Sequence, residues 1–588
     1  MIDPNVQVVE TPQPPKKSSK TLIIILIVLA VLLFCCCAAA ASLVLLDPFD
    51  LDLIGRLTGK TDLAAKAMPV DTPMYLGINL ANFSPDKVNE TIRPFMEASG
   101  QFDQNDSGDL IDELDQSLSE TAGMTITDDV IPWIGQYIGI GYFNPMSSTL
   151  TGDLAETQIV VSVEARDKTK ADEFIQKLIR SFQEEDSTYS VTEQAYEGVT
   201  IYALNDGYQS FAICRSGSLV LFGTPEMNVQ NAIDAQKGEN LRQSNSFKKM
   251  VAQLPGTQGI SVYFDGEQVR NLLNTAMSGY GIPSMQGIAQ SPMESWQDSI
   301  IALSLVDAGV QMDVVSSYDP ERLSDADIQM MSGKGGIPAS VSRLPEDTIM
   351  YIASKQLNLL WQTYRGAVIT ATGSDADYVE MMNLLEQQIG FDLEEDLVAY
   401  LDQDWTIAVV PDYNEIMIQL ADLPVGVMGV FGTSNQQALQ QTLTDFNAFL
   451  GTSGLSVNTQ EENQYTLYEI GDPTTGSSVA AYGIGNDYLG ISTSRDTLVN
   501  FFQGNSTLGD VEEHTKVWQA FDDNVIPSMY MDVSAGFELL RTVEGEYYAS
   551  DFAEIAPYME IIPYIAMGST PYRDGVVKNT LIIFIDKE

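Results

Sequence analysis

The spacing that most resembles a metal site lies in an acidic loop, DQNDSGDL, that begins at residue 103. Its oxygen-bearing side chains fall where a helix–loop–helix calcium site places its first ligands, and Gly108 occupies the position of the sharp turn. The candidate ligands are Asp103, Asn105, Ser107 and Asp109. The twelfth position, which normally supplies two oxygens from one glutamate, is Leu114. The loop is therefore an incomplete calcium site, and the competing interpretation is an acidic helix start, where carboxylates complement the helix dipole.

The chain contains one histidine, His514, within the segment EEHTKVW. A single imidazole excludes metal sites that need several histidines, and it leaves at most one histidine base for catalysis. The segment has the composition of a helix start, so we expect His514 to face solvent or to cap the helix.

Two pairs of adjacent carboxylates recur in the chain, Asp128 with Asp129 and Glu395 with Asp396. A hydrolase that works by acid and base needs two carboxylates with separated pKa values on either side of the reacting bond. Neighbouring residues on a helix point in different directions, so neither pair forms a facing pair. The recurrence favours a helix-start role over catalysis.

Nucleophilic chemistry has little support in the sequence. No Gly-x-Ser-x-Gly elbow is present, and Cys214, the one cysteine outside residues 35–37, has no activating residue nearby in sequence. We expect Cys214 to be a buried free thiol, with an intermolecular bridge as the alternative. The sequence assigns no catalytic residue and no cofactor-binding residue.

A long apolar stretch runs from Thr21 to Leu46 without a charged residue. As a helix its 26 residues would reach about 39 Å, more than the roughly 30 Å of a bilayer core. Three lysines shortly before it and three aspartates shortly after it place the N-terminus in the cytoplasm. We therefore expect an uncleaved transmembrane helix, with a cleaved signal peptide as the alternative. Small residues at 35–42 form a thin helix face that would allow self-association in the membrane.

The remaining chain is strongly acidic, since 81 Asp and Glu face only 30 Lys and Arg, a net charge of −51. Such a surface repels phosphate backbones, which excludes nucleic acid as a partner. The 44% of hydrophobic residues is ordinary for a globular protein, so the acidity does not indicate a disordered tail. Solubility in a salty or cation-rich exterior is the use we expect for it.

The outer region carries an internal repeat in unbroken order. MPVDTPMY at 68–75 recurs as LPEDTIMY at 344–351, and GMTITDDVIPWI at 123–134 recurs as GFDLEEDLVAYL at 390–401. SVYFD at 261–265 recurs as SMYMD at 528–532, so the offsets are 276, 267 and 267. Because the repeated segments keep the same order and are separated by nearly the same number of residues, they predict a tandem duplication. The predicted division is a cytoplasmic tail at 1–20, a transmembrane helix at 21–46, a connector at 47–67, and two ectodomain repeats at 68–340 and 341–588.

Each repeat has the same predicted order of elements. Strands that open the two repeats are expected at 74–80, 137–143 and 158–164, and at 349–353, 405–410 and 425–431. Helices are expected at 170–182, 227–236, 436–449 and 496–502. Hairpins with turn-forming residues are expected within 211–222 and 480–492, and two strands close each repeat, ending at 317 and 585. Hairpin-joined strands with helices between them predict an α+β fold on mostly antiparallel sheet.

The repeated Pro-x-Asp-Thr-x-x-Tyr opening, with the acidic segment before Pro132-Trp133-Ile134-Gly135, resembles the bacterial family called domain of unknown function 3352. The resemblance covers most of residues 68–588. The second repeat departs from the pattern, with Ala399 and Asp402 at the positions of Pro132 and Gly135. The resemblance implies a membrane-anchored protein of the cell envelope with no assigned chemistry, and it supplies no catalytic residues.

These observations favour a single-pass envelope protein with a duplicated, non-catalytic ectodomain for binding, scaffolding or envelope maintenance. The alternatives are a carboxylate-based ectoenzyme and an extracellular protein that binds cations or solutes. Expected partners are the lipid bilayer through residues 21–46, a second copy through the small-residue face, and an envelope protein or glycan. Tyrosines and prolines interleaved over 547–572 offer a surface for that last partner, although packing within the fold is the competing use.

Overall fold

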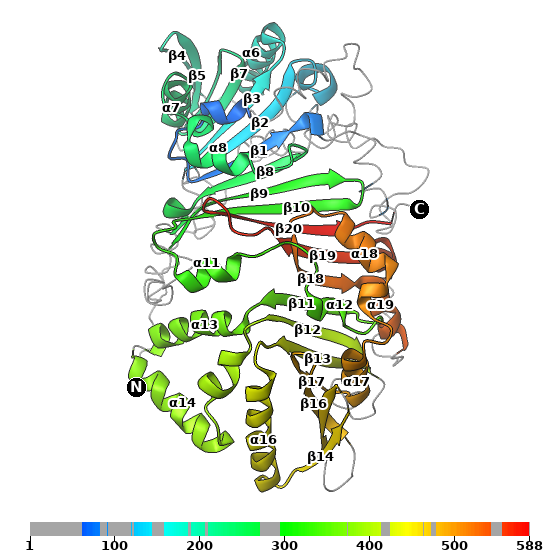
Figure 1. Ribbon diagram of the computed structural model, residues 1–588. Helices are drawn as coiled ribbons and strands as arrows, with labels where there is room; N and C mark the ends of the chain where they lie inside the picture. Colours follow the sequence, from blue (N-terminus) through cyan, green and yellow to red (C-terminus); the bar gives the residue numbers. More distant parts are fainter. Residues whose placement is uncertain are drawn as a thin grey trace, which may run out of the picture.

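A computed structural model of the chain describes most of residues 62–586 (Figure 1). The described ranges are 62–82, 123–143, 158–185, 190–205, 210–270, 295–372, 374–412, 424–462, 464–471, 478–542 and 556–586, with residues 91, 94 and 119. The predicted membrane segment at 21–46 and the acidic loop at 103–109 lie outside them. Within these ranges no helix combines the length and apolarity that crossing a bilayer requires.

The described residues up to 318 contain ten strands. They are β1 (Met74–Asn79), β2 (Ile134–Tyr142), β3 (Ile159–Ala165), β4 (Ser190–Tyr196), β5 (Val199–Asn205), β6 (Ser210–Ser216), β7 (Leu219–Thr224), β8 (Ile260–Asp265), β9 (Trp296–Val306) and β10 (Gly309–Tyr318). The described residues beyond 318 contain ten more. These are β11 (Met350–Lys355), β12 (Asp404–Pro411), β13 (Val425–Gly432), β14 (Ser456–Glu461), β15 (Tyr465–Gly471), β16 (Ser478–Gly485), β17 (Tyr488–Ser492), β18 (Ile526–Asp532), β19 (Tyr564–Ser569) and β20 (Val576–Phe584).

Helices occupy the connections between strands. In the first half they include α6 (Lys168–Glu185), α7 (Glu226–Lys237) and α8 (Asn245–Val251), with α11 (Asp325–Met331) and α12 (Ala339–Ser342) between the halves. In the second half they include α13 (Leu357–Thr372), α14 (Asp375–Ile389), α16 (Gln436–Thr452), α17 (Arg495–Gln503), α18 (Glu512–Gln519) and α19 (Val533–Thr542). Short helical turns include η2 (Ala64–Ala67), η4 (Ile126–Val130) and η8 (Leu393–Leu397).

All twenty strands form one antiparallel sheet. The first half pairs in the order β4-β5-β6-β7-β3-β2-β1-β8-β9-β10. The second half pairs in the order β14-β15-β16-β17-β13-β12-β11-β18-β19-β20, the same order with every number raised by ten. The halves meet where β10 pairs with β20, from Gly309 opposite Phe584 to Ser317 opposite Val576. Figure 1 shows these two strands side by side at the middle of the stack.

Tight turns with positive φ angles join the hairpins. Asn486 and Asp487 have φ angles of 51° and 63°, and they reverse the chain between β16 and β17. Glu197 and Gly198, at 51° and 82°, do the same between β4 and β5. Two successive residues with positive φ angles form a chain reversal that matches the twist of the flanking strands. The sequence signals for hairpins at 211–222 and 480–492 thus correspond to β6–β7 and β16–β17.

Helices pack on both faces of the sheet. On one face α6 covers β2 and β3 around Trp133, which is fully buried, and in the second half α16 packs against buried residues of β15, β16 and β17. On the other face α7 and α8 pack in the first half, and α17 and α18 pack in the second. The expectation of an α+β fold on antiparallel sheet is confirmed. The predicted division into two repeats at residue 340 stays a prediction, since one sheet runs through both halves.

Candidate functional site

The repeated Pro-x-Asp-Thr segment is a tight turn in both halves. The hydroxyl of Thr72 donates to the carbonyl oxygen of Pro69 at 2.7 Å, and its backbone N–H donates to the same oxygen at 3.2 Å. Thr348 makes both bonds to Pro345, at 2.7 and 3.1 Å. Both threonines are buried, and a buried hydroxyl needs a hydrogen-bond partner, which the proline carbonyl provides. The motif fixes the entry into β1 and β11.

Each turn is held against the segment that follows a helix of its own half, α7 in the first half and α17 in the second. Pro69 forms a β-bridge with Asn240, and Pro345 forms one with Thr507. The N–H of Leu241 donates to the carbonyl of Met68 at 2.9 Å, and the equivalent bond of the second half, from 508 to 344, measures 2.7 Å. The turn residues that follow the proline are thereby displayed at the surface.

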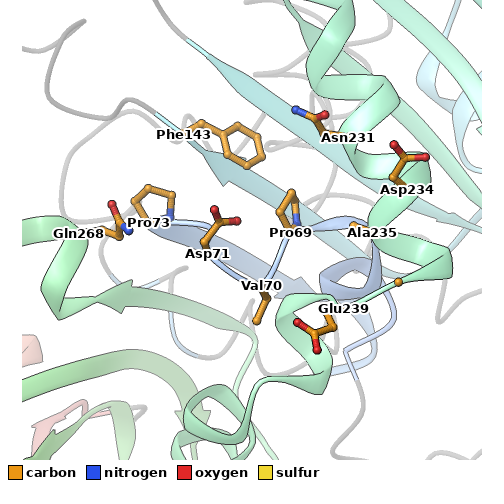
Figure 2. A pocket seen from close by; sticks show the side chains of 11 residues that line it. Pro69, Val70, Asp71, Pro73, Phe143, Asn231, Asp234, Ala235, Glu239 and Gln268 are labelled. Atoms are coloured by element: carbon orange, nitrogen blue, oxygen red, sulfur yellow. The ribbon is translucent and has the colours of Figure 1, made fainter.

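A hollow of about 620 Å³ opens beside the first turn (Figure 2). Its lining comes from the turn, the end of β2, α7 and the residues after β8: Pro69, Val70, Asp71, Pro73, Phe143, Asn231, Asp234, Ala235, Gly238, Glu239 and Gln268. Figure 2 shows Asp71 and Val70 between Gln268 on one side and the α7 residue Asp234 on the other. Asp234 also accepts a hydrogen bond of 2.7 Å from the hydroxyl of Tyr196.

A smaller hollow of about 340 Å³ opens beside the second turn. The turn, the ends of β12 and β18, and α19 contribute its lining: Glu346, Asp347, Thr348, Ile349, Pro411, Asp532, Ala535, Glu538 and Leu539. Burial raises the pKa of Asp347 above its ordinary value, and nearby Glu346 adds to the effect. Burial also raises the pKa of Asp532, although its carboxylate accepts a hydrogen bond of 2.7 Å from the N–H of Ala535. Both hollows therefore present carboxylates beside the same turn.

The tyrosine that ends each repeated motif lies in a buried aromatic centre. The first aromatic centre consists of Tyr75, Phe247 and Tyr263, with ring centroids 6.0 Å apart for the first two and 5.3 Å for the last two. The hydroxyl of Tyr75 donates to Asp62 at 2.5 Å, and burial raises the pKa of this carboxyl to about 6. The carboxyl also accepts bonds from the first N–H groups of η2.

The second aromatic centre consists of Tyr351, His514 and Tyr530, at the equivalent positions. The indole N–H of Trp518 points between Nε2 of His514 and the hydroxyl oxygen of Tyr351, at 3.1 Å from each. The Tyr351 hydroxyl lies 3.2 Å from the same Nε2. Burial lowers the pKa of His514 to about 4.

The expectation of an exposed or capping histidine is therefore wrong, because His514 is fully buried. Val517 and Trp518 of α18 are buried with it, and Phe521 follows. This spacing of three, four and seven residues is the apolar stripe of a core-facing helix. The same spacing is present in the sequence and was the signal that would have placed the histidine inside.

Comparison with known families adds one decisive observation. A family model described as a protein of unknown function, DUF3352, matches residues 26–562. The chain belongs to this family. No curated protein matches it.

Matches to solved structures of TP0453 are distant. Crystal form IV has a TM-score of 0.24 and 10% identity, covering 45% of this chain and 85% of that chain. Form I has a TM-score of 0.23 and 9% identity, covering 44% and 79%, and form III has 0.23 and 6%, covering 46% and 88%. Likeness at this level supports no conclusion about this DUF3352 member.

The paired carboxylates of the sequence lie at helix starts. Asp129 accepts a hydrogen bond of 2.9 Å from the N–H of Thr125 and pairs with Lys177 at 2.7 Å. Asp396 accepts the equivalent bond from Asp392 at 3.0 Å. The helix-start role predicted for both pairs is observed, and neither pair lines either of the two hollows described above.

The other predicted site residues have mixed outcomes. Asp103, Asn105, Ser107 and Asp109 lie outside the described ranges, so the calcium prediction stays open. Among the residues that the structure does describe, no group of three or more His, Cys, Asp or Glu side chains is placed to share a metal ion. Cys214 is a buried free thiol in β6, as expected, and burial raises its pKa to about 12. The sequence analysis missed the two hollows, because their linings combine segments up to about two hundred residues apart.

Proposed function

We propose that this DUF3352 protein is a single-pass envelope protein whose ectodomain binds or scaffolds other envelope components. Residues 21–46 would anchor it, with the N-terminus in the cytoplasm and two tandem homologous repeats outside. The apolar stretch and the lysines before it support the anchor. The strand order of the second half, identical to that of the first, supports the tandem repeats.

The unbroken sheet carries the scaffolding part of this proposal. Neighbouring strands lie about 4.8 Å apart, so twenty strands extend over about 90 Å. Because β10 pairs with β20, the two halves are linked by a continuous ladder of hydrogen bonds in place of a hinge. A rigid body of this length, tethered at one end of the chain, suits a protein that holds partners at a set distance from a membrane.

The two hollows support the binding part. Each places carboxylates beside a turn that the chain has twice, such as Asp71 in the first half and Glu346 in the second. Carboxylates at an open surface bind donors such as ammonium, guanidinium or amide groups. Basic or amide-rich segments of envelope proteins are therefore the partners that we expect there.

A topology experiment on the full chain tests the anchor. The chain carries different epitope tags at its two ends in its own host, and a protease is added to intact cells. We expect the C-terminal tag to disappear and the N-terminal tag to remain. Protection of both tags, or release of the full chain from the membrane by salt, would contradict the anchor.

Cross-linking tests binding at the hollows. Asp71→Ala and Glu346→Ala, separately and together, should lower the yield of cross-linked envelope partners by several-fold. Glu395→Ala, at an exposed helix start, is the matched control and should leave the yield unchanged. Equal yields from all variants would exclude the hollows as the binding surface.

A carboxylate-based ectoenzyme remains a second candidate, because the second hollow contains two carboxyls of raised pKa. A carboxyl whose surroundings raise its pKa is the kind of group that serves as a general acid. Hydrolase screening of the full chain, with Asp347→Asn and Asp532→Asn as variants, tests this candidate. Turnover that both variants abolish would favour the enzyme over the scaffold.

Cation or solute capture by the acidic surface is the third candidate, and the carboxylates of the hollows favour it. A ligand that binds only the folded chain must raise its melting temperature. A melting shift with calcium that Glu346→Ala removes would support this function, whereas a shift that no hollow variant changes would place the cation elsewhere.

A further inference from the structure

The strands around the junction of the two halves bury one of their two faces more deeply than the other. Across β8, β9, β10, β20, β19, β18 and β11, alternate side chains such as Tyr263, Ala302 and Tyr351 are buried, whereas neighbouring β1 buries residues on both faces. The helices α8 and α18 lie on that face, since Phe247 contacts Tyr263 and His514 contacts Tyr351. The residues between these positions point to the opposite face, because successive side chains of a strand alternate.

A row of directly paired residues defines this opposite face, which we call the open face. Leu303 pairs with Met312, which pairs with Leu581, and the row continues through Met567 and Met529 to Ile352. Partners directly opposite in an antiparallel ladder point to the same side of the sheet. The row therefore crosses the junction of the two halves on one continuous face.

The open face is accessible as well as apolar. Leu303 is 38% exposed and Ile352 is 47% exposed, whereas their neighbours along the strand, Ala302 and Ala353, are 0% and 2% exposed. The row continues to Ile407, which pairs with Ile352 and is also exposed. The remaining members of the row are half-buried.

Charged residues are absent from this row and from the parallel row beside it, which runs from Val310 to Met350 through Ile583, Ile565 and Met531. An antiparallel sheet with one solvated face normally carries polar residues there. The chain has 81 acidic residues to distribute and places none in these two rows. A contiguous apolar surface of this kind marks a binding site for an apolar partner.

Two observations favour a lipid over a second copy as that partner. Each copy has a net charge of −51, so two copies brought together repel, as would anionic headgroups, whereas lipids without net charge meet no such repulsion. Methionines are frequent in the rows, and their flexible side chains adapt to partners without fixed shape, as acyl chains are. The geometry of a broad, uncharged, methionine-rich strip therefore matches alkyl chains better than a second folded surface.

The chain before the sheet supplies the source of the lipid. Fifteen residues, 47–61, separate the predicted membrane segment from Asp62, and they extend at most about 50 Å. We propose that the open face binds the acyl chains of membrane lipids. Only the source of these lipids rests on the proposed anchoring; the apolar strip itself does not.

Photo-cross-linking of the full chain in its host membrane tests this inference. A photoreactive amino acid replaces Leu303 or Ile352, and the purified chain is weighed by mass spectrometry after irradiation. We expect adducts with the mass of a lipid at both positions. Met227 and Leu455 are exposed apolar residues away from the open face, and as matched controls they should give less than about one tenth of that yield.

Three results would overturn the proposal: adducts between two copies, adducts to another segment of the same chain, or lipid adducts of equal yield at the controls. A double variant, Ile352→Lys with Ile407→Lys, gives an independent readout, since both residues are exposed and the fold tolerates polar groups there. It should lower the lipid that copurifies with the chain at least five-fold while the melting temperature stays near that of the parent. If lipid adducts form but the topology experiment fails, the open face stands and the anchoring does not.

Discussion

The two aromatic centres share their tyrosines and differ in the polar group between them. In the first half Tyr75 donates to the carboxyl of Asp62, while the helix position that faces it is Phe247. In the second half that helix position is His514, which accepts from Trp518. Each solution supplies the partner that a buried hydroxyl needs. The strand order is identical, so the scaffold fixes where the polar group is needed but not which chemistry provides it.

Because of this difference, the stability of the two centres should respond to pH in opposite directions. A buried carboxyl of raised pKa favours the protonated state, and a buried imidazole of lowered pKa favours the neutral state. Acidification therefore stabilises the first centre, where the buried carboxyl becomes neutral, and destabilises the second, where the buried imidazole would become charged. Variants that exchange or remove these groups test how independent the halves are.

The largest expected effect is at Trp133, which is fully buried against α6 and donates to the carbonyl of Asp129 at 2.8 Å. Trp133→Ala should lower the free energy of unfolding by about 3–5 kcal/mol. The equivalent residue of the second half, Tyr400, is only half-buried, so Tyr400→Ala should cost about 1–2 kcal/mol. Denaturant unfolding measures both, and equal losses would mean that the two cores are built alike.

The next effect is the acid sensitivity of the second centre. The pKa of His514 in the folded chain, about 4, lies below its ordinary 6.5. The histidine therefore contributes stability above pH 6.5 that is lost as the pH falls through about 4, up to about 3 kcal/mol. In His514→Phe this loss should vanish, and Phe247→His should introduce it into the first half. Melting temperatures from pH 8 to pH 4 give the readout, and parallel curves for parent and His514→Phe would refute it.

A smaller effect of opposite sign is expected at Asp62. Its pKa of about 6 lies above the ordinary 3.8, so its favourable contribution is complete below pH 3.8 and is lost as the pH rises through about 6. Asp62→Asn keeps the acceptor for Tyr75 without the charge. Relative to the parent, it should gain about 1–2 kcal/mol between pH 5 and pH 8. A constant difference across this range, measured in the same unfolding series, would show that the carboxyl does not titrate with folding.

The smallest effect should be the same in both halves. Thr72→Val and Thr348→Val each remove one buried hydroxyl bond to a proline carbonyl. Each should cost about 1 kcal/mol, because that is the net contribution of a typical hydrogen bond. Unequal losses would mean that the two turns have different roles in the fold.

Much of the fold was predictable because its signals are local. Strand and helix periodicity, together with turn residues such as Asn486, located β1, β2, α6, the β16–β17 hairpin and α16 within a few residues. The repeat in the sequence predicted matching element orders. The order of the strands in the sheet and the β10–β20 junction were not predictable, because they depend on pairings between residues far apart in sequence.

The candidate site was less predictable, for physical reasons. The hollows arise where a turn meets a helix more than one hundred and fifty residues later, so no spacing along the chain reveals them. His514 appeared exposed because charged neighbours surround it in sequence, although its own helix face is apolar. The open face was hidden for a similar reason. Its residues alternate with buried ones that include apolar side chains such as Ala302, Ile582 and Tyr351, and the composition of a strand does not say which face is covered.

The central claim is that the two halves have the same strand order and are joined by the pairing of β10 with β20. Paired cysteines test it most directly: Met312→Cys with Leu581→Cys places two thiols directly opposite each other, and both side chains are half-buried on the open face. Cys214 is buried and resists oxidation, and the cysteines at 35–37 are replaced by alanine. We predict rapid disulfide formation for this pair and little for Met312→Cys with Ile583→Cys, which is shifted by two residues. No disulfide in the first pair, or equal yields in both, would contradict the junction.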